Sequence, residues 1–227
     1  MCKKTFHTEL AYLLGIISLA FGTALMEKAD FGISMVVAPA YLIFRKLSLV
    51  MPFVTFGMAE YFFQAALLVV LMFVLRKVKI SYLFSFVTAV IYGFILDICM
   101  YSVSVVPSDS VYVRIIFYIF GMIMCSLGVS LLFHTYIAPE VYELCVKLLS
   151  NKYKVNISKF KTGYDCVSCA IGIILSFAFF GMWQFVGVKL GTIICALVNG
   201  ITIGFISRIL EKHFDFADKF KLRRFFE

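Results

Sequence analysis

Charged residues are scarce in this sequence: Asp, Glu, Lys and Arg together make up 15% of its 227 residues. A water-soluble domain carries roughly 25%, so too little polar surface is available to cover a soluble globule. Hydrophobic residues make up 63% of the chain, and the mean hydropathy is +0.99. This composition excludes an ordinary soluble domain and indicates a protein for which lipid is most of the solvent.

Known catalytic and metal-binding motifs are also missing. The sequence has no HExxH, nucleophile elbow, P-loop or dinucleotide fingerprint, and its His residues are scattered at positions 7, 134 and 213. Cys166 and Cys169 form a CxxC, but it lies in an apolar segment without a second pair or a nearby His. We therefore expect a protein that is not an enzyme and that uses no metal or cofactor.

The formal net charge of +8 would suggest a nucleic-acid partner in a soluble protein, but no nucleic-acid motif accompanies it. The basic residues fall in short loops and tails, where they act as topology signals and contacts to anionic lipid. We therefore expect the lipid bilayer as the main partner and no nucleic acid.

Six apolar segments are long enough to cross the hydrocarbon core, which takes about 20 residues of helix. They are Leu10–Met26, Thr55–Leu75, Ser81–Val105, Val111–Phe133, Tyr164–Val186 and Leu190–Ile209. The first has no clear signal-peptide cleavage site after it, and we interpret it as a retained span.

The basic residues predict the orientation of these spans. With the N-terminus in the cytoplasm, most of the 21 Lys and Arg residues fall on the cytoplasmic side. Those on or near the other side are Lys28, Arg45, Lys46, Arg114 and Lys189. The sequence therefore predicts a multi-pass protein of a bacterial cytoplasmic membrane with both termini inside. It forms a single domain over residues 1–210, followed by a basic, aromatic tail over 211–227 that anchors at the interface.

An internal repeat divides the chain. The stretch LAFGTAL at 19–25 aligns with CSLGVSL at 125–131, which places Gly22 opposite Gly128 at an offset of 106. Gly57 matches Gly163 at the same offset. Three spans per half is an odd number, so the second half must enter from the opposite face. We predict an all-α protein of two inverted three-helix repeats, about 10–105 and about 111–209.

Two further features accompany the repeat. Phe31–Lys46 and Pro139–Asn151 are amphipathic and too short to span, so each half gains a short helix that is either re-entrant or interfacial. In the third and sixth spans, small residues recur every four positions, at Gly93 in one and at Gly200 and Gly204 in the other. Such faces let helix backbones approach closely, and we expect these two spans to pack together centrally.

These segments give the chain a resemblance to the YczE/YyaS/YitT-like family of bacterial integral membrane proteins. The residues that carry it are Gly22 with the ADFG at 29–32, Gly128 with the IAPE at 137–140, Gly163, and the VGVKLGT at 186–192. The resemblance covers roughly residues 10 to 210 and implies an integral membrane protein without a defined activity. The Pro and the acid that relatives carry after the first span are absent from Gly32–Met35. We expect no soluble C-terminal domain of the kind found in the YitT branch.

Polar residues inside the predicted spans are the candidate pathway residues, because an ionised group facing lipid costs at least ~2.5 kcal/mol. Glu60, Asp97 and Arg114 share a level near the outer side, either as a proton or cation site or as a structural ion pair. Asn199 is the candidate for a midplane hydrogen bond to a ligand or a neighbouring helix.

A second set of polar residues lies near the cytoplasmic side. It comprises His134, Glu140, Glu143 and Asp165, and the repeat places Asp165 close to the counterpart of Glu60. A carboxylate near each mouth of the pathway would suit alternating access. Two alternatives remain at this point: Glu140 and Glu143 facing the cytosol, and His134 as an interfacial hydrogen-bonding residue rather than a proton relay.

The sequence is most typical of a small transporter or permease for an unidentified small molecule or ion, working by alternating access between inverted repeats. A homodimer is one arrangement it could adopt. Two other functions fit the same features: a membrane-embedded ligand-binding or accessory subunit of a larger complex, and a channel.

Overall fold

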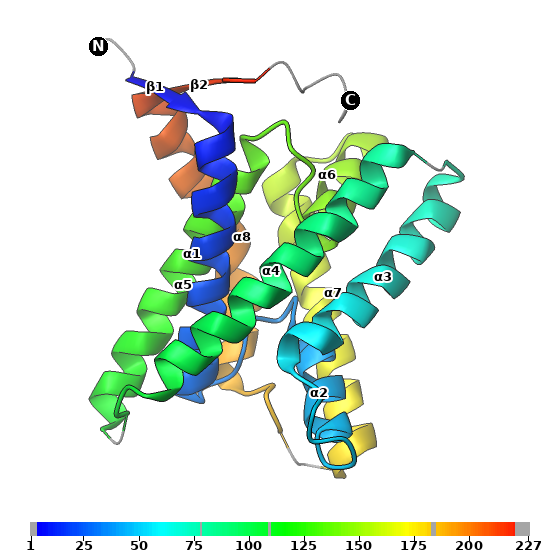
Figure 1. The fold of residues 1–227 in the computed structure, drawn as a ribbon, viewed down its shortest axis with the longest axis vertical. Helices are drawn as coiled ribbons and strands as arrows, with labels where there is room; N and C mark the ends of the chain where they lie inside the picture. The colour runs from blue at the N-terminus through cyan, green and yellow to red at the C-terminus, as the bar shows by residue number, and fades with distance from the viewer. Residues whose placement is uncertain (1–3, 78, 109, 183–184, 221–227) are drawn as a thin grey trace.

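The computed structural model describes residues 4–77, 79–108, 110–182 and 185–220 (Figure 1). Its helices are α1 (Thr8–Ala29), α2 (Ala38–Leu47), α3 (Phe56–Leu75), α4 (Ile80–Ser104), α5 (Val111–Phe133), α6 (Val141–Tyr153), α7 (Ile157–Phe180) and α8 (Leu190–His213). Two short strands, β1 (Lys4–His7) and β2 (Phe214–Ala217), pair in parallel. The prediction of an all-helical protein with six membrane-length helices is confirmed: α1, α3, α4, α5, α7 and α8 are long and apolar enough to cross a membrane.

The fifth span was predicted too late in the chain. It runs from Ile157 rather than Tyr164, because the side chain of Asn156 accepts hydrogen bonds from the backbone N–H groups of Ser158 and Lys159 and so caps the helix. It ends at Gly181, whose φ of 101° a residue with a side chain rarely adopts. The true span therefore includes Lys161, which hydropathy alone assigns to a loop.

The central helix pair is α1 and α5, whose backbones touch. A Cβ atom built on Gly22 would lie 2.6 Å from the carbonyl oxygen of Gly121, and one built on Gly128 would lie 2.7 Å from that of Gly15. Gly22 and Gly128, which the sequence predicts as packing residues, both lie at this contact. The expectation that the third and sixth spans pack together centrally is wrong, because α1 and α5 occupy that position.

The glycines of α4 and α8 face other neighbours. A Cβ on Gly93 would collide with the ring of Tyr61 on α3, and a Cβ on Gly200 would collide with Thr162 on α7. Helix α4 thus packs against α3 as α8 packs against α7. Small residues on these faces bring each half together rather than joining the two halves.

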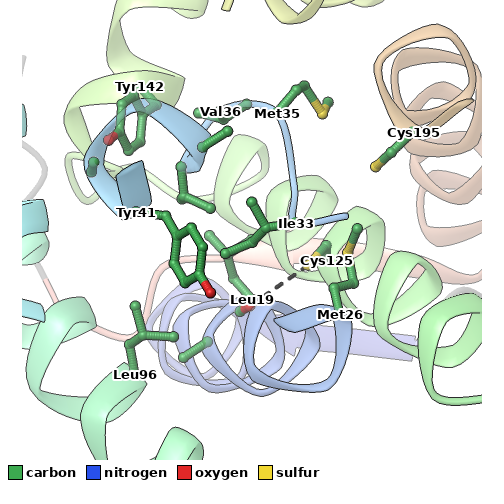
Figure 2. Close-up of a cluster of buried hydrophobic side chains, with 14 of the residues drawn as sticks. Leu19, Met26, Ile33, Met35, Val36, Tyr41, Leu96, Cys125, Tyr142 and Cys195 are labelled. Carbon is green, nitrogen blue, oxygen red and sulfur yellow. Dashed lines mark hydrogen bonds between the residues drawn. The ribbon is translucent and has the colours of Figure 1, made fainter. Parts of the chain in front are cut away.

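The short helices α2 and α6 lie at opposite ends of the molecule (Figure 1). Both begin inside it, because α2 is buried from Ala38 to Leu42 and α6 from Val141 to Val146. The predicted helix at 31–46 begins only at Ala38, after a non-helical segment. Figure 2 shows Ile33, Met35 and Val36 of this segment among side chains of the main hydrophobic core. Neither short helix is therefore a purely surface element.

Both described chain ends lie at one end of the molecule, where β1 and β2 pair (Figure 1). The carboxylate of Glu9 accepts hydrogen bonds from the backbone N–H groups of Lys219 and Phe220. Helix α8 continues to His213, so the start of the predicted tail, residues 211–213, is helical and the next four residues form a strand. Lys3 and the final stretch of that tail, 221–227, lie outside the described residues.

The α1–α5 contact predicts a sharp difference between two glycine substitutions. Gly22→Ala should destabilise the protein by about 1–3 kcal/mol, because the new methyl group meets backbone of α5 that cannot move aside. Gly163→Ala is the matched control: nothing lies within 4 Å of its Cβ position, so only the helical preference of Ala acts, a gain of up to about 1 kcal/mol. Thermal unfolding in detergent measures both, and equal melting temperatures would contradict the backbone contact.

Candidate functional site

Four buried carboxylates gather around one buried lysine in the interior. Glu60, Glu140, Glu143 and Asp165 are each at most 3% exposed, and Lys161 is 1% exposed. We call these five residues the carboxylate cluster. With every group ionised its formal charge is negative, and isolated buried charges are very unfavourable unless they are paired or neutralised.

Three helices bring the carboxylate cluster together. Glu60 and Lys161 lie on α3 and α7, and Glu140 and Glu143 lie at the start of α6, which packs against both of those helices. The N-terminus of α6 points into the protein interior, where its unpaired amides and helix dipole favour negative charge. This end of α6 is therefore the natural place for buried carboxylates.

On the α3 side, Gln64 links two acids. Its Nε2 donates to Glu60 Oε2 at 3.2 Å and to Glu140 Oε2 at 3.1 Å, while its Oε1 accepts from the backbone N–H of Val141 at 3.1 Å. The hydroxyl of Tyr142 donates to Glu60 Oε2 at 2.9 Å. No cation among the described residues contacts Glu60 or Glu140, and the buried Oε1 atoms of both have no hydrogen-bond partner there.

On the α7 side, Lys161 supplies the positive charge. Its Nζ lies 3.0 Å from Asp165 Oδ1 and 3.5 Å from Glu143 Oε1. Asp165 also accepts from Asn199 Nδ2 at 3.2 Å, and Asn199 Oδ1 accepts from Ser126 at 3.0 Å. This chain of contacts connects α6, α7, α8 and α5, and in it Asn199 bonds to side chains of two neighbouring helices.

A small cavity opens beside the carboxylate cluster. Its volume, counted as the space open to the centre of a water molecule, is about 20 Å³, which is enough for one water molecule. The lining residues are Leu19, Thr23, Ser34, Val36, Val37, Tyr92, Cys125, Val129, Glu140, Tyr142, Glu143, Lys161 and Asn199. We call it the central cavity, because it adjoins the α1–α5 contact at Leu19 and Cys125.

Glu140 is the cluster acid most strongly shaped by these surroundings. Burial, together with the neighbouring carboxylates of Glu143 and Glu60, raises the pKa of Glu140 well above its ordinary value. Its carboxyl group also faces the central cavity. Glu140 is therefore a buried acid at the central cavity whose surroundings favour its protonated form.

A larger hollow, of about 520 Å³ by the same measure, lies where α1 ends and α2 and α8 begin. We call it the vestibule. Its lining is strongly charged and comprises Glu27, Lys28, Asp30, Tyr41, Arg45, Ser108, Phe185, Val186, Gly187 and Lys189. A smaller pocket at its base adds Met26, Gly32 and Ile33. The vestibule therefore leads toward the non-helical segment 31–37.

This segment separates the vestibule from the central cavity. Ile33 and Gly32 line the pocket at the vestibule's base, and Ser34, Val36 and Val37 line the central cavity. The segment is tied to the start of α8, because Ile33 N donates to Gly187 O at 2.9 Å and Thr192 Oγ1 donates to Ile33 O at 2.9 Å. It thus forms a thin barrier between the two spaces.

The structure corrects the predicted outer ion site. Arg114 does not pair with Glu60 or Asp97: it lies 3.1 Å from Asp30, which Lys189 also contacts. Asp97 accepts from Thr55 and from the backbone N–H of Gly57, so it caps the start of α3. Arg114 pairs elsewhere because Asp30, at the end of α1, offers it a carboxylate, while Glu60 and Asp97 bond to different partners.

Three of the four residues predicted near the cytoplasmic side lie together in the structure, and His134 does not. Glu140 and Asp165 join Glu60 in the carboxylate cluster, so the acids do not lie at opposite mouths, and the alternative of a cytosol-facing Glu140 and Glu143 is wrong. His134 lies apart, stacked on Phe216 with ring centroids 4.6 Å apart and with Nε2 3.1 Å from Glu211. His134 thus makes hydrogen bonds at the end of α5, away from the carboxylate cluster.

The sequence analysis missed Lys161, Gln64 and Tyr142 as site residues. Lys161 was counted as a loop cation, although its spacing of four residues from Asp165 is that of an ion pair on one helix face. Gln64 stands in the same relation to Glu60. The four-residue spacing within Lys161/Asp165 and within Glu60/Gln64 was the feature of the sequence from which Lys161 and Gln64 could have been predicted.

Comparison with known proteins gives one match. Residues 6–208 fit the family model DUF6198, described as a family of unknown function. No curated protein and no solved structure matches the chain. The resemblance to the YczE/YyaS/YitT-like family stays an expectation from the sequence.

The carboxylate cluster predicts that Lys161 stabilises its surroundings mainly by neutralising charge. Lys161→Met should destabilise the protein by about 3–5 kcal/mol, because it leaves buried carboxylates without a cation. Adding Asp165→Asn should restore most of that loss. Lys152→Met, at an exposed lysine of α6, is the control and should change stability by less than about 0.5 kcal/mol. Thermal unfolding of all four proteins tests this, and a double variant no more stable than Lys161→Met would refute the charge account.

Proposed function

The chain belongs to DUF6198, a family of unknown function, and we propose that it is a small membrane transporter. In this proposal two inverted repeats alternate access to the central cavity, which must widen from its volume of about 20 Å³ to bind an unidentified small solute. The observation that carries the proposal is the lining of the central cavity, which draws matched residues from both halves of the chain and adjoins the carboxylate cluster.

The match in the lining is close. Leu19, Thr23, Ser34, Val36 and Val37 each have a lining partner 106 positions later in the chain. The partners are Cys125, Val129, Glu140, Tyr142 and Glu143. A cavity on a pseudo-two-fold axis would be lined in this way, and transporters with inverted repeats bind their substrates at such an interface.

The hydrogen bonds between α1 and α5 support the same axis. Ser18 Oγ donates to Met124 O at 2.9 Å, and Cys125 Sγ donates to Leu19 O at 3.7 Å (Figure 2). Both bonds join residues 106 positions apart. Equivalent residues of two repeats touch each other only beside the axis that relates them.

The packing of the other helices supports it as well. Helix α1 packs on α4 as α5 packs on α8, and α2 packs on α3 and α7 as α6 packs on α7 and α3. The placement of α2 and α6 at opposite ends of the molecule fits repeats of opposite orientation (Figure 1). We infer that the helices move as two similar groups around the α1–α5 contact.

The buried ionisable residues and the two hollows, the vestibule and the central cavity, favour transport over a purely structural role. Buried ionisable residues within membrane spans are unfavourable and usually mark ion or substrate pathways. The vestibule opens at the end where α2 lies, and the segment 31–37 closes it from the central cavity. Gly32, with φ of 119°, and Gly187, with φ of 70°, lie where this barrier would bend.

The rest of the proposal follows from the sequence. We propose a bacterial cytoplasmic membrane with both termini on the cytoplasmic side, which makes the vestibule an outer entrance. The proposed protein is not an enzyme, and a homodimer is compatible with it. A ligand-binding or accessory subunit of a larger complex and a channel are the alternatives.

Solute binding and uptake test the proposal. A library of amino acids, sugars, vitamins and organic ions should contain a solute that raises the melting temperature of the purified protein. Proteoliposomes should take up that solute with saturable kinetics, and Glu140→Gln should reduce uptake at least about tenfold, because it removes the ionisable group that faces the cavity. Asp97→Asn should lower stability through the lost cap of α3 and keep the uptake rate per folded protein.

The alternatives give different results in the same system. Conductance without saturation would establish a channel, and co-purification with an ATPase without uptake by the protein alone would establish an accessory subunit. Either result would refute the transporter. Uptake lost in Asp97→Asn at normal protein levels would refute the assignment of that residue to the cap.

A further inference from the structure

The two halves of the carboxylate cluster differ in one respect that bears on the driving force. Glu60 and Gln64 are one turn apart on α3, as Lys161 and Asp165 are on α7. The α7 pair contains a cation, which neutralises part of the charge of Asp165 and Glu143. The α3 pair contains no cation, and Gln64 joins it to a second acid, Glu140. The α3 side therefore lacks the positive charge that its two carboxylates require.

We propose that the Glu60–Gln64–Glu140 bridge is a proton-binding site and that its proton is the ion coupled to solute movement. The first part stands on the geometry of the bridge, and the coupling rests on the proposed transporter function. The proton neutralises one of two buried carboxylates, which otherwise carry two negative charges without a counter-ion.

Hydrogen bonding locates the proton on Glu140. The backbone N–H of Val141 donates to Gln64 Oε1, so the amide must turn its NH₂ group toward the acids, one hydrogen for each. Glu60 receives a second donor, the Tyr142 hydroxyl. Glu140 receives no second donor from the described residues, and the Oε1 atoms of both acids are buried without a partner there. A carboxylate with more donors is better stabilised in its charged form.

The surroundings of Glu140 are consistent with this assignment. The titratable groups that face it from the packed elements are Tyr12 on α1, Glu60 on α3, Tyr92 on α4, Cys125 on α5, Tyr142 and Glu143 on α6, and Lys161 on α7. Lys161 is their cation, and it lies against Glu143 and Asp165. Burial and the two neighbouring acids raise the pKa of Glu140, as described above.

A proton fits this site better than a metal ion. No group of three His, Cys, Asp or Glu side chains in the described part of the chain is arranged to hold a metal. When the cavity opens to an aqueous side, the O–H bond of Glu140 breaks, the proton passes to water, and water solvates the remaining carboxylate. Closure on the other side requires a proton to return.

Infrared spectroscopy of the full chain in lipid nanodiscs tests the site without a solute. The carbonyl band of a protonated carboxyl group should be present at neutral pH, disappear as the pH is raised, and be lost or strongly reduced in Glu140→Gln. Potentiometric titration should show about one proton fewer per chain in that variant. In a second variant, Glu60→Gln, the Glu140 band should disappear at a lower pH than in the wild type, because a neighbouring negative charge is removed. Glu211→Gln, at an exposed acid, should keep the wild-type spectrum.

Thermal unfolding gives an independent check. Because an acid with a raised pKa destabilises the folded state once it ionises, wild-type stability should fall as pH rises through that pKa, and Glu140→Gln should flatten this dependence. A neutral-pH spectrum without a protonated carboxyl band, or a band unchanged in Glu140→Gln, would overturn the proton site. Stabilisation by Na⁺ over K⁺ at constant pH, lost in Glu140→Gln, would overturn it in favour of a metal cation.

The outcomes separate the two proposals. Solute uptake that is coupled to acidification of the vesicle lumen, measured with a trapped pH dye, supports both. If the Glu140 carboxyl group titrates as predicted but the protein transports no solute, the proposed transporter function and the coupling are refuted, and the proton site is retained. Uptake that proceeds without any proton movement refutes the coupling alone.

Discussion

The backbone contact between α1 and α5 is the constraint on which the rest of the structure depends. Gly22 and Gly128 allow the two helices to meet without intervening side chains. The other helices pack outward from this pair, and the central cavity lies beside it, lined from both halves of the chain. A bulkier residue at either glycine would separate the helices that hold the cavity walls, so this contact also sets the shape of the central cavity.

Burial of charge is the second feature that the fold has to accommodate. Lipid-facing helices cannot carry ionised groups, and the N-terminus of α6 provides an enclosed position for them between α3 and α7. Lys161 neutralises part of the charge there, and the Glu60–Gln64–Glu140 bridge carries the remainder. The pair on α7 contains a cation and the corresponding pair on α3 does not. This difference in charge is the basis of the proposed protonation site.

The sequence was informative where local composition decides the structure. Helix length and apolar content were sufficient for the six spans, and the aligned Gly22 and Gly128 were sufficient to identify two close-packing positions. Hydropathy failed at the start of α7, because the free energy of burying Lys161 depends on Glu143 and Asp165, and the partner on α6 can be found only from the fold. For the same reason the sequence paired Arg114 with Glu60 or Asp97, whereas the fold places Asp30 beside it.

Elements that rely on distant contacts were also beyond the sequence. The non-helical segment 31–37 is held by the loop before α8, and the β1–β2 pair joins the two described ends of the chain. Both depend on residues more than 150 positions away, as in the bond between Thr192 and Ile33. A resemblance between two halves, by contrast, is visible in a single sequence because it repeats within it.

The orientation of the two short helices tests the central claim most directly. If the halves are inverted repeats in a membrane, Val50 in the exposed turn after α2 and Lys154 at the C-cap of α6 must face opposite aqueous sides. Single cysteines at these positions, in a chain whose native cysteines are replaced, can be labelled in intact cells with a membrane-impermeant maleimide. Labelling at position 50 in intact cells, and at 154 only after permeabilisation, is the predicted result. Labelling of both positions from the same side would contradict the account.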